Sequence, residues 1–246
     1  MSRKEFPPSA TLSATDQRYP KAVSRLLGSK APEQLFCMGN LALLSMPGVG
    51  FCGSRKASDR GIAVADDCAR QLVKAGFVVI SGNAAGVDHA AHKTALEAGG
   101  CTILVLPEGL DHFRIRKTLA DAWDWNRTLV ISQFPSTAVW QNYRAMERNN
   151  LIIALSRAMV VIEAGATGGT LHAGKSTLKM GLPLFVVEYS DMKSLAPGNQ
   201  ELISLGGLPV RKSPHSGRAN VERIEVAATS PVTTVAMNMG TLPLAL

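Results

Sequence analysis

Gly53-Ser54-Arg55 closes a short apolar run, GVGFC (residues 48–52), and leads into a segment with helical spacing. A second turn of the same kind, SGNAAGVDHAAH (residues 81–92), follows the apolar run 77–80. Open α/β sheets place their ligand sites at turns that follow the carboxyl ends of buried strands. The two stretches therefore predict an α/β sheet with a binding site built from these turns.

The middle of the chain repeats this alternation of apolar runs and amphipathic segments, which is typical of βαβ units. Short, fully apolar strands suit a parallel sheet that helices cover on both faces. We predict a three-layer αβα fold of the Rossmann-like type with an open, mostly parallel sheet. Strands are expected at 48–52, 77–81, 101–106, 128–132, 158–163 and 183–188, and helices at 58–75, 88–98, 114–123, 144–156, 169–180 and 198–205.

The two ends of the chain differ in composition from its middle. Residues 1–18 are polar and rich in Ser and Thr, so we expect a flexible N-terminal arm. Residues 19–212 are expected to form the Rossmann-like domain, which begins with a helix and a short extended segment. Residues 213–246 show no clear period, and we expect a mostly disordered tail. A length of 246 residues supports one substantial core rather than two.

The net charge of +7 favours polyanionic partners, nucleic acid among them. No apolar run approaches the roughly 20 residues that cross a bilayer, and no apolar leader follows the charged N-terminus. The four cysteines form no Cys-x-x-Cys pair, which is typical of reduced thiols in the cytoplasm. We expect a cytoplasmic protein without a metal or another cofactor.

Two matches to nucleotide-binding motifs fail on their context. GVGFCG (residues 48–53) satisfies G-x-G-x-x-G, but it coincides with the strand itself, and no ribose-binding acid ends the next strand. GTLHAGKS (residues 169–176) satisfies the P-loop pattern, yet only six residues separate it from Pro183, under two helical turns. A helix that starts near Gly169 and stops at Gly181 fits better. Lys175 is then a helix-surface lysine.

The turn after the first strand offers groups that suit a phosphate. Gly53 permits close approach, Ser54 supplies a hydroxyl and an amide, and Arg55, with Lys56 beside it, supplies positive charge. A guanidinium can hold phosphate through two parallel charge-assisted bonds. Ser58 is a suitable N-cap for the next helix.

The second turn contributes Gly82 and Asn83 as candidates, with Asp88 expected to cap the helix that carries His89 and His92. Two histidines at this spacing can meet a metal, but no third ligand is apparent, so a packed helix is the better interpretation.

Two later segments add further candidates. Arg148 and Asn149 lie in a predicted helix, where Arg148 is left with two alternatives, contact with a ligand or an ion pair with an acid such as Glu163. A glycine-rich turn then precedes another helix, whose positive N-terminal end favours an anion. Its candidate residues are Gly165, Gly168, Gly169 and Thr170.

Four segments, in this order and spacing, resemble the Rossmann-like domain of the DprA/Smf family. They are GSR (53–55), SGNAAGVDHAAH (81–92), ERNNLII (147–153) and EAGATGGTL (163–171), and LFCMG (35–39) resembles the family's lead-in. The resemblance runs from about Tyr19 to Gly207. It implies a homodimeric protein that binds single-stranded DNA through the residues above and hands it to the RecA recombinase during natural transformation, without catalysis. Members often carry a helical domain before and a winged-helix domain after this part, and we expect neither here.

The chain departs from the family pattern at three points. Ala85 stands where the family usually has a charged residue, and Asn150 replaces the last Arg of an Arg-Asn-Arg segment. Ala145-Met146 replaces Phe-Pro, so an aromatic for base contact is missing, and Tyr143 or Trp140 could substitute for it. The alternative function is nucleotide binding or hydrolysis, as in the LOG-type phosphoribohydrolases. Their Pro-Gly-Gly-x-Gly-Thr-x-x-Glu motif matches residues 165–170 only in its glycines, which disfavours an enzyme.

Overall fold

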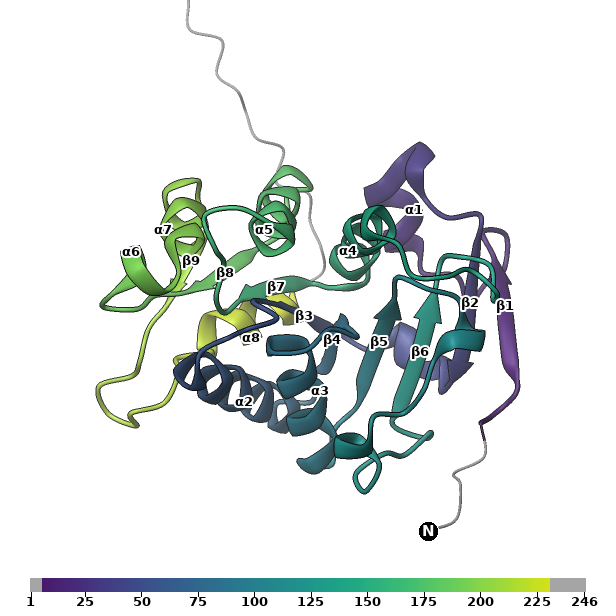
Figure 1. Cartoon of the computed structure of the whole chain (residues 1–246), viewed down its shortest axis with the longest axis horizontal. Coiled ribbons are helices and arrows are strands. Elements are labelled where there is room, and N and C mark those ends of the chain that lie inside the picture. Colours follow the sequence, from purple (N-terminus) through teal and green to yellow (C-terminus); the bar gives the residue numbers. More distant parts are fainter. Residues whose placement is uncertain (1–5, 231–246) are drawn as a thin grey trace, which may run out of the picture.

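The computed structural model describes residues 6–230, which form one nine-stranded sheet between two layers of helices (Figure 1). The strand order is β1-β2-β6-β5-β4-β3-β7-β8-β9. Every pairing is parallel except β1 with β2 and β2 with β6. The strands are β1 (Ser9–Ser13), β2 (Gln34–Gly39), β3 (Gly48–Cys52), β4 (Val78–Gly82), β5 (Thr102–Leu106), β6 (Thr128–Ser132), β7 (Ala158–Val161), β8 (Leu184–Val187) and β9 (Leu208–Val210).

The strand order reverses at β3, which determines where a ligand can enter. From β3 the chain builds outward through β4, β5 and β6, and it then returns to place β7 on the other side of β3. The loops that follow β3 and β7 diverge to opposite faces, which leaves a crevice between them. The Rossmann-like prediction is confirmed, and each of its six strands is present within one or two residues of the expected bounds.

Two helical layers cover the sheet because strands buried on both faces need apolar partners on both. One layer consists of α2 (Asp59–Lys74), α3 (Val87–Glu97) and α8 (Glu222–Thr229), with the short α6 (Met192–Leu195) beside them. The opposite layer consists of α1 (Lys21–Leu27), α4 (Asn142–Leu155), α5 (Gly169–Lys179) and α7 (Pro197–Ser204). Among residues 6–230, no helix is long and apolar enough to cross a bilayer.

The helix expected at 114–123 is wrong. The segment forms only a short 3-10 turn at Lys117–Leu119, and Arg116 is extended, with φ −65° and ψ 141°. Leu119 and Trp123 bury their side chains in a small cluster around Phe113, while the Arg116 guanidinium donates to the carbonyl of Asn83. These tertiary contacts outweigh the local helical spacing.

The expectation of flexible ends is also wrong where the structure describes them. β1 lies inside the expected arm and pairs with β2, although Leu12 is its only buried residue, which is why the stretch looks like a polar arm. α8 lies inside the expected tail and buries Ile224 and Ala228, with Val221 just before it, against the sheet. The remainder of the expected arm and tail, residues 1–5 and 231–246, lies outside the described residues.

Candidate nucleic-acid interface

A cavity of about 420 Å³ opens at the point where the strand order reverses. It receives residues from the turn after β3, the start of α3, one face of α4, the loop after β7 and the first turn of α5. Its lining consists of Cys52, Gly53, Ser54, Arg55, Ala84, Asp88, Asn142, Ala145, Met146, Arg148, Asn149, Gly165, Thr167, Gly169 and Thr170. Elements far apart in sequence thus build one site.

The turns after β3 and β4 fit together through two glycines. A Cβ on Gly53 would collide with the Val87 side chain, so only glycine lets this turn lie against α3. Gly86 has φ +73°, and a Cβ there would collide with the carbonyl of Ser54. The Ser54 hydroxyl accepts from the Lys56 amide at 3.0 Å, which shapes the turn and leaves the Arg55 side chain exposed.

Arg148 lies at the base of the cavity and is only 5% exposed. Its Nη1 donates to the carbonyl of Val105 at 2.5 Å, while its Nε has no partner among the described residues. Burial lowers the pKa of this guanidinium, and the nearby carboxylates of Asp88 and Glu108 oppose that shift. Gly82 leaves room for the group, because a Cβ there would overlap the guanidinium.

Glu163 does not pair with Arg148, so the ion pair considered for these two residues is absent. Instead, its carboxylate accepts from the Ser58 amide at 2.9 Å and from the Ser58 hydroxyl. Ser58 is the N-cap of α2, as predicted, and its Oγ also accepts from the Gly61 amide at 3.0 Å. The end of β7 is thereby tied to the start of α2.

The glycine-rich turn leads directly into α5. Gly168 is the N-cap residue with φ +106°, a conformation that favours glycine, and α5 begins at Gly169. Gly169 and Thr170 of this first turn line the cavity, and the first amides of a helix, which lack partners within it, suit an anion. Lys175 lies further along the helix and pairs with Glu201 at 2.6 Å, so the prediction that the P-loop match is an ordinary helix is confirmed.

Most predicted candidates meet at this cavity, but not all. Gly53, Ser54, Arg55, Arg148, Asn149, Gly165, Gly169 and Thr170 line it. Asn83 lines a neighbouring cavity of about 280 Å³ that shares Arg55 and Arg148 with the first. Lys56, Gly82 and Gly168 line neither of the two.

Several lining residues were not among the predicted candidates. On α4, Asn142 and Met146 lie on the same helix face as the predicted Asn149, and their spacing of four and three residues was visible in the sequence. Trp140, one of the two aromatics considered as a substitute for the family's Phe, lines the neighbouring cavity and is 49% exposed, so its ring is available for stacking. Glu108 lines it as well, and burial raises the pKa of its carboxyl group.

The capping role predicted for Asp88 is wrong, whereas the packed position predicted for His92 is confirmed. Asp88 was expected to cap α3, but Gly86 is the N-cap residue, and the Asp88 carboxylate instead accepts from the Ala84 amide at 3.3 Å. His92 is buried and packed as predicted. Its Nε2 lies 2.7 Å from the Gly82 carbonyl, which can only accept, so Nε2 carries a proton. Its Nδ1 lies 2.6 Å from the Thr102 hydroxyl, which itself donates to the Val79 carbonyl at 2.8 Å.

Comparison with known proteins decides the family. A family model described as DNA recombination-mediator protein A matches residues 10–215. The chain belongs to this family. The DprA protein of Streptococcus pneumoniae is 34% identical over 205 residues, which cover 82% of this chain and 71% of the relative. Protein Smf of Synechocystis is 30% identical over 81% of this chain, and the chain spans about half, 54%, of that relative's length.

Solved DprA structures have the same fold. The S. pneumoniae structure aligns with a TM-score of 0.72 and 31% identity, over 84% of this chain and 71% of the other. A Helicobacter pylori structure aligns with a TM-score of 0.71 and 27% identity, over 82% of this chain and 91% of the other. That structure is described for its single-stranded DNA binding mode. The predicted DprA/Smf membership is therefore confirmed.

Proposed function

We propose that the 420 Å³ cavity binds single-stranded DNA and that the protein passes the strand to a RecA recombinase without chemical change. The observation that carries this proposal is convergence: Arg55 and the first residues of α5, Gly169 and Thr170, line one cavity from the two sides of the strand reversal. A phosphate between them would receive charge-assisted bonds from the one and amide bonds from the other.

The charges around the cavity indicate a division of roles. The carboxylates of Asp88 and Glu108 offset the charge of Arg148, whereas Arg55 is exposed, makes no ion pair with the residues that the structure describes, and can neutralise a phosphate. Ala145 and Met146 offer an apolar wall to a base, and the exposed ring of Trp140 offers a stacking surface next door. In a duplex the faces of the bases are stacked on one another. A single strand, whose base faces are accessible, is therefore the preferred ligand.

The RecA contact, a homodimer and a cytoplasmic location complete the proposal, and membership of a recombination-mediator family supports them. The DNA-binding step is the first to test. Fluorescence anisotropy with a labelled single strand and with a duplex of equal length should show tighter binding of the single strand. Equal or tighter binding of the duplex would contradict the proposed site.

Arg55→Ala provides the residue-level test of the same proposal. Loss of one charge-assisted phosphate contact should weaken single-strand binding about ten- to a hundredfold. Lys175→Ala removes the same charge from α5 at a residue that pairs with Glu201, and it should change affinity little. Both variants should keep the wild-type melting temperature, because both side chains are exposed. Equal losses in the two variants would mean that binding is nonspecific attraction to a basic surface.

A further inference from the structure

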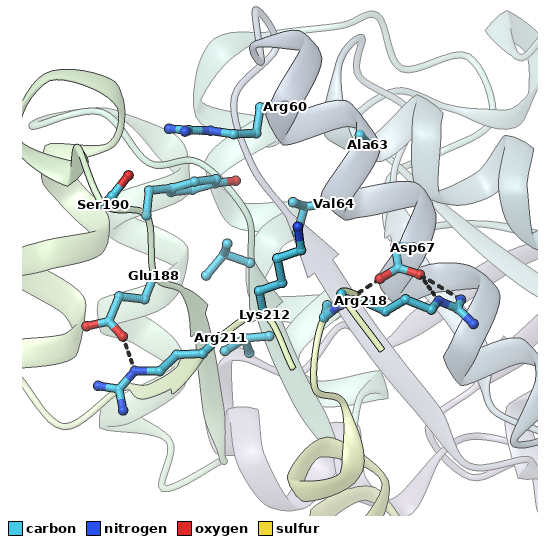
Figure 2. Close-up of a pocket in the computed structure, with 14 residues that line it drawn as sticks. Arg60, Ala63, Val64, Asp67, Glu188, Ser190, Arg211, Lys212 and Arg218 are labelled. Atoms are coloured by element: carbon cyan, nitrogen blue, oxygen red, sulfur yellow. Dashed lines mark hydrogen bonds and ion pairs between the residues drawn. The ribbon is translucent and has the colours of Figure 1, made fainter. Parts of the chain in front are cut away.

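A second, larger cavity of about 590 Å³ lies on the α2 side of the sheet, where β8 and β9 end. Its walls come from the first half of α2, the residues after β8, and the loop that joins β9 to α8 (Figure 2). Val64, Val187, Val210 and Ala219 make much of the surface apolar. A volume of this size is typical of sites for small organic ligands.

The arginines at the rim are already paired. Arg218 donates to Asp67 at 2.7 Å, and Arg211 pairs with Glu188 (Figure 2). Arg60 pairs with Asp191, which does not itself line the cavity. These pairs hold the walls in place and leave little free charge on the guanidinium groups.

Lys212 is the exception. It makes no ion pair or hydrogen bond with the described residues, and its side chain reaches from the end of β9 across the cavity toward Val64 on α2 (Figure 2). Its ammonium group is exposed at the cavity and is therefore available to an anion.

Tyr189 gives the cavity an aromatic ring. The residue is 7% exposed and lines the cavity, while its hydroxyl is closed off from solvent and has no hydrogen-bond partner among residues 6–230. Burial raises the pKa of this phenol, so it stays neutral. The ring is therefore the part of Tyr189 that a ligand in the cavity can reach.

We propose that this second cavity binds a nucleotide, with the phosphate at Lys212 and the base over the apolar wall and the Arg60 guanidinium. The Arg60 guanidinium lies 5.0 Å from the centroid of the Tyr189 ring, which holds it as a planar platform. Guanidinium planes of this kind stack on nucleobases. A purely aliphatic acid would use the ammonium and the valines but not this platform.

Two sources could supply the nucleotide. A free mononucleotide would make the cavity an independent ligand site. A residue of the bound strand would make it an extension of the DNA path, since α2 separates the two cavities: its lead-in turn supplies Arg55 to the first, and Arg60 lines the second. The first case is independent of the proposed function, whereas the second rests on it.

The free-nucleotide arm uses thymidine 5′-monophosphate, with thymidine as the ligand without phosphate. Calorimetric titrations are made in the Arg55→Ala background, so that the first cavity does not contribute. Lys212→Gln should weaken monophosphate binding about three- to tenfold, and Lys74→Gln, the same change at the far end of α2, should not. Ala63→Phe narrows the cavity from an exposed helix position and should weaken binding at least as much.

The strand arm compares oligothymidylates of about four and about sixteen nucleotides on the otherwise wild-type chain. If the second cavity holds a residue of the strand, Lys212→Gln should reduce affinity for the long oligonucleotide about three- to tenfold and leave the short one unchanged. The proposal is overturned if Lys212→Gln and Lys74→Gln behave alike in both arms, or if Ala63→Phe is silent in both while its melting temperature is that of the wild type. Failure of the proposed function is a separate result, an Arg55→Ala variant that binds single strands normally.

Discussion

Arg55 and Arg148 carry the same charge, but the fold gives them different environments. Arg55 is exposed at the cavity mouth, whereas Arg148 is buried at its base with Nη1 bonded to the Val105 carbonyl. The sequence indicated that both belong to the site, because Arg55 lies in the turn after a predicted strand and Arg148 lies in a helix that resembles a segment of the family. It did not distinguish a residue that binds from one that supports, since that difference depends on Gly82, whose missing Cβ makes room for the Arg148 guanidinium.

Arg148→Ala should therefore destabilise the protein. The substitution leaves the nearby carboxylates of Asp88 and Glu108 without their buried cation and opens a cavity at the ends of β4 and β5. We expect the free energy of unfolding to fall by about 1.5–3 kcal/mol, the scale for a hydrogen bond to a charged group, here the bond from Nη1 to the Val105 carbonyl. Urea unfolding at neutral pH measures it, with Arg55→Ala as the matched control. A loss below about 0.5 kcal/mol, the size of ordinary surface substitutions, would contradict the buried role.

His92 makes stability depend on pH. Burial, which disfavours the charged ring, lowers its pKa from 6.5 to about 4, and the hydrogen bond to the Gly82 carbonyl opposes that shift only in part. The unfolded chain therefore takes up a proton near pH 6.5 and the folded chain does not, so the contribution is complete above pH 6.5 and declines as pH falls toward 4. Between pH 7 and pH 5 the free energy of unfolding should fall by about 2 kcal/mol from this group.

Urea unfolding of the wild type and of His92→Gln at the two pH values tests this contribution. The glutamine variant is less stable at pH 7, but it lacks the titrating ring. It should therefore lose about 2 kcal/mol less than the wild type on acidification. Identical losses in the two proteins would show that other groups cause the acid sensitivity.

At the scale of elements, what could be predicted depended on how locally each element is determined. The strands β3 to β8 were predicted because each is an apolar run bounded by turn residues, whereas the three-residue β9 was not expected; α5 was predicted because the residues after its P-loop match left no room for a P-loop helix. The 114–123 segment was wrongly predicted as a helix because Trp123 and Leu119 pack around Phe113, a contact invisible to local spacing. The site followed the same rule: its turns, Arg148 and Asn149 were predicted, but the contribution of Asn142 and Met146 on α4 was assembled only by the fold.

The link between β7 and α2 is a cap that can be tested as a unit. Ser58→Ala removes the side-chain bond to the Gly61 amide and the hydroxyl bond to Glu163, and should cost about 1–2 kcal/mol of unfolding free energy. Glu163→Gln weakens the same link from the other side. Because both substitutions act on the same hydroxyl–carboxylate hydrogen bond, the double variant should lose at least 0.5 kcal/mol less than about the sum of the single losses. Additive losses, measured by urea unfolding, would mean that the cap and the carboxylate act independently.

At the scale of the whole molecule, the strand order of the sheet explains where the two cavities lie. The prediction of flexible segments was wrong at the two ends of the described chain. The reversal at β3 places one cavity between β3 and β7, and the extension through β8 and β9 creates the second. β1 and α8 belong to the same fold, yet Leu12 and Ile224 have few buried neighbours in sequence, so composition alone indicated loose ends. Their partners are β2 and the sheet face, both distant along the chain.

The net charge of +7 belongs to the whole molecule, and salt dependence separates it from the site. Single-strand affinity should fall with salt, with a log–log slope of about −0.7 for each phosphate neutralised. Arg55→Ala should make that slope shallower by about 0.7, because one phosphate contact is lost, whereas Lys175→Ala should leave it unchanged. Anisotropy titrations across a salt series measure all three slopes. If both variants reduce the slope equally, the phosphates follow the diffuse positive field of the protein, and the turn at Gly53-Ser54-Arg55 has no privileged contact with the strand.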